Sequence, residues 1–184
     1  MQILGGILYS NEILFQGFID GLVYALIAMG LVLIYKATGV INFAQGAIGT
    51  FGGFVMGMLM VNYDLPYWLA AILAIAASAA ISTVTELLVV RRLFTKPRLL
   101  LFVATLGVAQ LVALIQIWLP TVDERVDYPT PIKGYWEIGG IDILLRGEQV
   151  TVLIVVPFIV IVLGYLLQKT RFGLAVRSAA DNPG

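Results

Sequence analysis

The chain contains no cysteine and no histidine. It therefore lacks the side chains for a Cys- or His-based zinc site, for haem ligation by histidine, for a Ser-His-Asp triad and for a Cys–His nucleophilic pair. We expect neither a metal site nor a cofactor on this chain. The same absence removes any disulfide pattern that would indicate a compartment.

Charged residues are also scarce, at 12% of the 184 residues against 60% hydrophobic residues. Soluble domains carry about 25% charged residues, so much of this chain is suited to lipid rather than water. The 11 basic and 11 acidic residues cancel in number. The total charge therefore predicts no general affinity for nucleic acid or other polyanions.

Long apolar segments fill most of the sequence. A spanning helix needs about 20 mainly apolar residues to cross the hydrocarbon layer. The candidates are residues 17–35, with Asp20 in the first turn, 40–61, 66–90, 99–119, and 150–167, with a kink at Pro157. We therefore predict an all-α, polytopic transmembrane bundle with about five spans, one of them broken near Asn42–Gly46.

The basic residues orient these spans. Eight of the eleven fall at Lys36, in the loop Arg91–Arg98, and after the fifth span at Lys169, Arg171 and Arg177. Alternating spans place all three groups on one side, which the positive-inside rule makes cytoplasmic. We expect a multi-pass protein of the inner or plasma membrane, with its N-terminus outside and Lys169–Gly184 in the cytoplasm.

The opposite side receives a long loop, residues 120–149, which is rich in acidic residues. Within it, Tyr135 to Leu145 alternates around Gly139-Gly140, a pattern that predicts a short β-hairpin. Two interpretations stay open for this external loop. It is either a solvated connector with some local structure or a docking surface for an external partner.

The segment Gly39-Val40-Ile41-Asn42-Phe43-Ala44-Gln45-Gly46 sits where the second apolar segment begins. Non-helical backbone at membrane depth needs protein or a water-filled cavity to satisfy its polar groups, and transporters often place such interruptions at the solute site. We predict a solute pathway formed by Asn42, Phe43, Ala44, Gln45 and Gly46. The alternative, of equal weight from the residues alone, is an ordinary turn at the membrane interface.

Gly49, Gly53 and Gly57 repeat every four residues along the second span. Such a stripe lets another helix approach closely, so we predict a helix-packing role for the three glycines. Direct contact with a solute is the less favoured interpretation.

A basic, amphipathic segment follows the fifth span, from Thr170 to Asn182. One interpretation is an anchor that fixes the membrane topology. The other is a short helix that offers Arg177 and Asp181 to a cytoplasmic protein.

Two of these runs together resemble the permeases of branched-chain amino-acid ABC transporters. The first extends from Gly21-Leu22-Val23-Tyr24-Ala25-Leu26 through Ile41-Asn42-Phe43-Ala44-Gln45-Gly46, and the second from Thr170-Arg171-Phe172-Gly173 to Arg177-Ser178-Ala179-Ala180-Asp181. The resemblance covers essentially the whole chain. It departs at Gln45, where many relatives have a His followed by Gly and Glu, because here Ala47 follows Gly46. Any role of that acidic position is absent.

The resemblance implies a single transmembrane permease domain over residues 1–184, incomplete and N-terminal, with residues 168–184 as a cytoplasmic coupling segment. Arg171, Gly173, Arg177 and Asp181 would couple it to ATPases. The implied partners are a second permease subunit, two cytoplasmic ATPase subunits that hold ATP and magnesium, an external solute-binding protein and membrane lipid. ATP hydrolysis would lie on the partners, so the chain itself would not be an enzyme. The implied solutes are branched-chain amino acids, with urea or short amides as the alternative.

Three other classes are weighed against this one. An intramembrane enzyme would need a nucleophile with a base, or a metal cluster, for which the spans offer little beyond Asp20 and Glu86. A non-transporting membrane scaffold would explain the small-residue faces but not the broken segment joined to a cytoplasmic contact. A secondary transporter would also use broken helices but usually carries carboxylates at mid-membrane.

Overall fold

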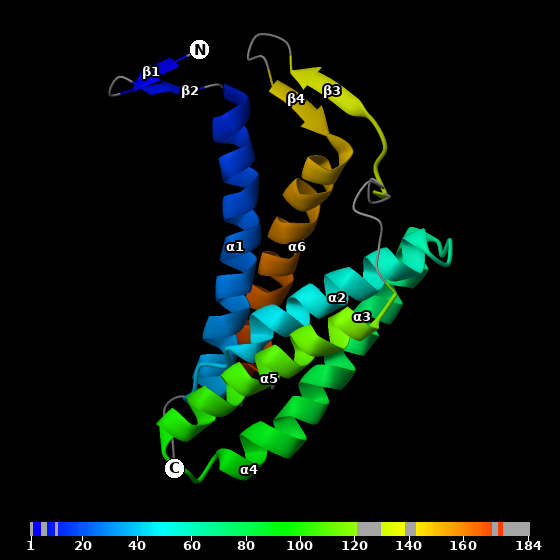
Figure 1. Cartoon of the computed structure of the whole chain (residues 1–184). Helices are drawn as coiled ribbons and strands as arrows, with labels where there is room; N and C mark the ends of the chain where they lie inside the picture. Colours follow the sequence, from blue (N-terminus) through cyan, green and yellow to red (C-terminus); the bar gives the residue numbers. More distant parts are fainter. Residues whose placement is uncertain are drawn as a thin grey trace. The chain divides into compact units, whose positions relative to one another are not determined.

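The computed structural model describes residues 2–4, 7–9, 11–120, 130–138, 143–170 and 173–174. Within these residues, five helical segments are long and apolar enough to cross a membrane. Their principal helices are α1 (Asn11–Thr38), α2 (Ala44–Val61), α3 (Tyr67–Thr85), α5 (Arg98–Trp118) and α6 (Gly147–Lys169), drawn in Figure 1. The expected all-α, polytopic bundle is confirmed.

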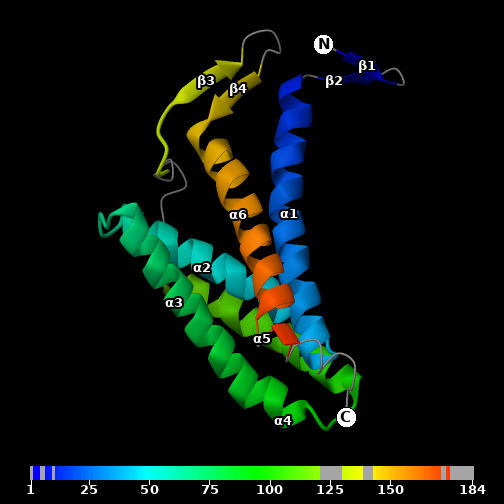
Figure 2. The ribbon, with the colours of Figure 1, turned by 180° about the vertical axis from the view of Figure 1, so that it is seen from behind.

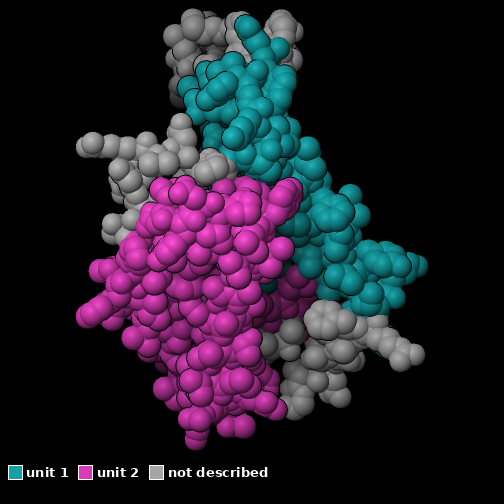
Figure 3. Space-filling model, turned by 90° about the vertical axis from the view of Figure 1, so that its right-hand side faces the viewer, with its two compact units in different colours: residues 1–30, 130–184 teal, residues 31–129 magenta. Residues whose placement is uncertain are grey.

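The chain divides into two compact units, coloured separately in Figure 3. The first unit contains residues 1–30 and 130–184, and the second contains residues 31–129. The division falls inside α1, so this helix contributes to both units.

The second unit is built from three long helical rods. After α2, the α3 rod continues through a π-helical turn, η1 (Glu86–Val90), into α4 (Arg91–Leu93). Prolines with extended backbone precede two of the rods: Pro66 before α3 and Pro97 before α5. Because proline has no N–H to donate, it fits directly before a helix and marks where each rod starts.

The core of the second unit lies where α2 packs against α3 and α5. Its buried side chains are Ala44, Ile48, Phe51, Val55, Ala74 and Val112. The outward faces remain apolar and exposed, as Trp68 on α3 (70%) and Trp118 on α5 (83%) illustrate. Exposed apolar surface of this kind suits lipid, as expected for a membrane-spanning unit.

The first unit contains the N-terminal part of α1 together with α6, which Figures 1 and 2 draw as neighbouring ribbons and which a hydrogen bond between Gln16 and Gln149 joins. It also holds two small antiparallel hairpins, β1 (Gln2–Leu4) with β2 (Ile7–Tyr9), and β3 (Tyr135–Ile138) with β4 (Ile143–Arg146). The second hairpin confirms the signal around Gly139-Gly140. The first was not expected, although Gly5-Gly6 between two apolar runs is the same kind of signal.

Two helices begin three or more residues earlier than the sequence predicts. Helix α1 begins at Asn11 rather than near residue 17, and α6 begins at Gly147 rather than 150. The apolar residues Ile13, Leu14 and Phe15 extend α1 toward the N-terminus, beyond the span predicted to begin at residue 17. Asp20 therefore lies in the third turn of α1, not in the first.

Candidate functional site

The predicted interruption is present between α1 and α2, where residues 39–43 are not helical. Gly39 adopts a left-handed conformation, with φ of +69°, and its N–H donates to the Tyr35 carbonyl at 2.7 Å. A glycine adopts this conformation without steric cost and is therefore the usual residue just beyond a helix end. Gly39 ends α1 and turns the chain toward α2.

Asn42 fixes the start of α2. Its side-chain oxygen Oδ1 accepts a hydrogen bond from the Ala44 N–H at 3.0 Å, and its carbonyl accepts one from the Gln45 N–H at 3.3 Å. The first N–H groups of a helix have no partner within the helix, so an amide at this place stabilises the helix start. The asparagine that we predicted to face a solute is thus engaged with the backbone of α2.

Thr105 on α5 holds the interruption from the other side. The Phe43 N–H donates to Thr105 Oγ1 at 3.4 Å, and the Thr105 hydroxyl donates to the Phe102 carbonyl at 2.9 Å. The Phe43 and Phe102 rings meet edge to face with centroids 4.8 Å apart. Thr105 is almost fully buried, at 1% exposure. Sequence analysis missed it, because a single Thr within an apolar span gives no positional signal.

The five predicted pathway residues occupy different environments. Ala44 is completely buried in the core of the second unit, whereas Asn42 and Gln45 are half-buried. Phe43 and Gly46 are exposed. The residues are consecutive in the break and first helical turn and do not share one face. Their role in a solute pathway stays a prediction.

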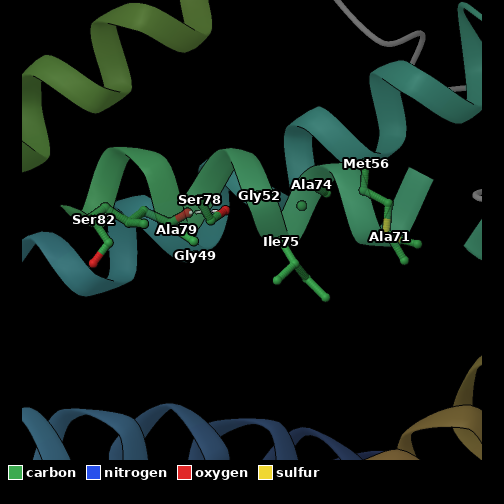
Figure 4. A pocket seen from close by; sticks show the side chains of 11 residues that line it. Gly49, Gly52, Met56, Ala71, Ala74, Ile75, Ser78, Ala79 and Ser82 are labelled. Carbon is green, nitrogen blue, oxygen red and sulfur yellow. Dashed lines mark hydrogen bonds between the residues drawn. The ribbon is translucent and has the colours of Figure 1, made fainter. Parts of the chain in front are cut away.

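A groove of about 520 Å³ runs along α2 and α3, and Figure 4 shows the small side chains that line it. A Cβ atom added at Gly49 or Gly53 would meet nothing within 4 Å, whereas one added at Gly52 would overlap the Ser78 hydroxyl. The close approach of α2 to α3 therefore falls at Gly52. The Ser78 hydroxyl also donates to the Ile48 carbonyl at 3.4 Å. Gly49 and Gly53 line the groove, Gly57 is buried, and the packing role predicted for the three glycines stays a prediction.

A second polar constellation joins α1 to α6 within the first unit. The Gln149 side-chain amide donates to Gln16 Oε1 at 2.7 Å, and the Gln16 amide donates to Asp20 Oδ1 at 3.0 Å. Gln149 Oε1 in turn accepts the Arg146 N–H at 2.9 Å, which caps the start of α6. Gln149 is buried, at 7% exposure. Sequence analysis gave no role to Gln16 or Gln149, which lie 133 residues apart.

Comparison with known proteins identifies the family. The profile of the permease component of branched-chain amino acid transport systems matches residues 13–184. The chain belongs to this family. The break after α1 and all five spans, apart from the first two residues of α1, lie within the matched region.

Individual members of the family are distant in sequence. The chain is 26% identical to the high-affinity branched-chain amino acid transport system permease protein LivH of Escherichia coli K12 and to that of Salmonella typhimurium, over 95% of this chain and 60% of the relative. It is 28% identical to a probable branched-chain amino acid transport permease protein LivH of Methanocaldococcus jannaschii, over 100% of this chain and 55% of the relative. The chain thus spans somewhat more than half the length of these curated relatives. No solved structure matches it.

The predicted coupling segment of this family member follows α6. Arg171, Arg177 and Asp181 lie outside the described residues. Gly173 is buried against the end of α6, where its N–H donates to Thr170 Oγ1 at 3.3 Å and an added Cβ would overlap the Leu167 carbonyl. Gly173 therefore fits a tight turn directly after the helix.

No metal-binding cluster is found in the described part of the chain, where no three acidic side chains gather. Glu148 has a basic neighbour instead, with its Oε1 3.8 Å from Arg146 Nη1. Both of these side chains are more than half exposed, so the pair contributes little to stability.

Proposed function

We propose that this chain is the membrane subunit of an ATP-driven importer for branched-chain amino acids or similarly small solutes. The observation that carries the proposal is the family match, which extends from residue 13 to residue 184 and covers all five spans except the first two residues of α1. The LivH relatives of Escherichia coli and Salmonella typhimurium are named for high-affinity branched-chain amino acid transport. Urea and short amides remain the alternative solutes.

The proposed orientation puts the N-terminus outside and the basic loop Arg91–Arg98 in the cytoplasm. The break between α1 and α2 then lies at the cytoplasmic end of the membrane, beside Lys36. Phe43 and Gly46 are exposed there, so they are the members of the predicted pathway best placed to contact a solute as it leaves. Asn42 and Thr105 would hold the break in shape while neighbouring helices shift.

The proposed partners are a second permease subunit, two cytoplasmic ATPase subunits with ATP and magnesium, and an external solute-binding protein. Arg171, Gly173, Arg177 and Asp181 would receive the movement of the ATPases. The tight turn at Gly173 supports this role, because a segment fixed directly to the end of α6 passes a displacement on to that helix.

The test is reconstitution. The gene is expressed with its neighbours, the complex is purified through a tag on this chain, and ATP hydrolysis and solute uptake are measured in proteoliposomes with the binding protein added. We expect an ATPase subunit to co-purify, and leucine-loaded binding protein to raise both activities above those obtained with the unloaded protein.

Other outcomes separate the alternatives. Stimulation by urea or acetamide but not by leucine keeps the importer and replaces the solute. An ATPase that co-purifies without stimulation by any of these solutes contradicts the proposed transport. A stable assembly without an ATPase favours the membrane scaffold.

A further inference from the structure

A polar strip runs along one face of α1. Gln16, Asp20 and Tyr24 follow one another at four-residue intervals, and Gly17 and Gly21 lie beside them. Residues at this spacing share a helix face. All five are exposed in this chain, Tyr24 to 71%. The strip therefore combines a carboxylate, an amide and a hydroxyl with two positions that carry no side chain.

The strip lies at membrane depth. At 1.5 Å per residue, Asp20 is about 14 Å along α1 from Asn11. When the 26-residue apolar segment Asn11–Lys36 is centred on a hydrocarbon layer of about 30 Å, Asp20 lies about 9 Å inside that layer. An ionisable side chain at such a depth is costly in lipid, so it faces protein or a water-filled path.

A directed chain of hydrogen bonds ends at Asp20. The Arg146 N–H donates to Gln149, the Gln149 amide donates to Gln16, and the Gln16 amide donates to Asp20 Oδ1. Every bond points its donor toward the carboxylate, and the chain starts at the positive N-terminal end of α6. Aligned bonds of this kind polarise one another, which strengthens the last bond to its acceptor oxygen. Gln149 is buried, so this chain of hydrogen bonds starts from a fixed amide, which orients the Gln16 side chain toward Asp20.

The same carboxylate keeps an oxygen for a ligand. Within the part of the chain that the structure describes, Asp20 Oδ2 has no hydrogen-bond partner. Gly17 and Gly21 leave open space next to it, since a Cβ added at either position would meet nothing within 4 Å. A small group with several N–H donors and a positive charge fits this arrangement better than an anion or an apolar group does.

We propose that Asp20 binds the primary ammonium group of the solute, in a site on α1 that Gln16 positions and Tyr24 completes. The inference rests on the proposed function and deepens it. Asp20 Oδ2 accepts from the ammonium, and the Tyr24 hydroxyl, one turn further along, is placed to donate to the carboxylate of a zwitterionic amino acid. In the proposed orientation this site belongs to the outer half of α1, on the side where solute arrives.

Because the chain has no cysteine, a single introduced cysteine reports on the strip without changing Asp20. Gly21→Cys is made in this chain within the assembled importer, and Gly17→Cys is a second reporter if the first disturbs assembly. The rate of labelling by a membrane-impermeant maleimide, added from outside, is measured with no solute, with leucine, with isopentylammonium and with 4-methylpentanoate. Gly164→Cys on α6 is the matched control, because an added Cβ there also meets nothing within 4 Å.

We expect Gly21→Cys to react with the reagent added from outside. Gly164→Cys should remain unlabelled, because in the proposed orientation it lies about 26 Å along α6 from the outer end of that helix at Gly147. At a solute concentration twice its Kd, leucine and isopentylammonium should each slow the reaction about threefold, because the reactive free form falls to about one third. The carboxylate 4-methylpentanoate should not slow it. Adding Asp20→Asn should abolish the protection while labelling without solute continues.

Three results would overturn the inference: no labelling at both Gly17→Cys and Gly21→Cys, labelling that no ammonium compound slows, or protection that survives Asp20→Asn. Uptake by the unmodified importer, measured in parallel, keeps the two hypotheses apart. Leucine uptake without protection rejects the site alone, whereas protection by isopentylammonium without uptake of any amino acid keeps the site and rejects the proposed function.

Discussion

The two units join their helices by different means. In the first, α1 and α6 are connected through side-chain amides, with Gln149 donating to Gln16 at 2.7 Å. In the second, α2 and α3 approach closely at Gly52, where an added Cβ would overlap the Ser78 hydroxyl. Lipid tails are as apolar as the helix surfaces, so burying apolar area does not drive helices together in a membrane. Close packing and interhelical hydrogen bonds drive their association instead. Each unit relies mainly on one of these two, and each should fail in its own way.

Disrupting the packing of α2 against α3 in the second unit should cause the largest loss of stability. Gly52→Val places a Cβ atom that overlaps the Ser78 hydroxyl and adds two methyl groups beside it, and such overpacking costs about 2 kcal/mol of unfolding free energy. We expect a loss of this size in an SDS titration of the purified protein in mixed micelles.

Gly53→Val is the control, since the same side chain one residue later meets nothing within 4 Å at its Cβ. Gly52→Ala with Ser78→Ala should recover most of the stability that Gly52→Ala alone loses, because the hydroxyl is the first atom in the way. Equal losses for Gly52→Val and Gly53→Val would place the close approach elsewhere.

Removing the hydrogen bond between Gln149 and Gln16 in the first unit should cause a smaller loss of stability. Gln149→Leu removes the cap of the Arg146 N–H and leaves Gln16 without its donor, and interhelical hydrogen bonds in membranes are worth about 0.6 kcal/mol on average and at most about 1.7. We expect a loss of about 1 kcal/mol in the same titration.

Gln110→Leu on α5 is the matched control, because this amide is exposed and has no hydrogen-bond partner in the described chain. Gln110→Leu should leave the free energy of unfolding unchanged. Comparable losses for the two variants would mean that the Gln149–Gln16 bond does not join α1 to α6 in the membrane.

In both units the sequence predicts the local features but not the contacts between distant residues. The five spans follow from the length of the apolar runs, and the break after α1 follows from Gly39 and the polar residues behind it. These are local properties. The contact of Gln16 with Gln149 and that of Phe43 with Thr105 join residues 133 and 62 positions apart, which hydropathy cannot pair.

The glycine stripe illustrates the same limit. The four-residue spacing predicts a packing role for Gly49, Gly53 and Gly57, which stays a prediction, and it does not indicate Gly52, where α2 comes close to α3. Spacing tells which residues share a face and not which face meets the neighbouring helix, because that depends on how the two helices are rotated. The apolar run likewise predicts Asp20 in the first turn of a helix. Because α1 begins at Asn11, Asp20 lies in its third turn instead.

The smallest expected effect concerns the hydrogen bond between Phe43 and Thr105 within the second unit. Thr105→Val keeps the shape of the buried side chain and removes the acceptor of the Phe43 N–H, whose bond at 3.4 Å is long. We expect a loss of about 0.5–1 kcal/mol, at the lower end for a hydrogen bond, and faster hydrogen exchange at the Phe43 amide with little change along α5. Thr105→Ser, which keeps the hydroxyl, should preserve the slow exchange at Phe43 even though it leaves a small cavity. If both variants speed exchange equally, the packing around Thr105 holds the break between α1 and α2, and the second unit uses steric contact even where a hydroxyl is available.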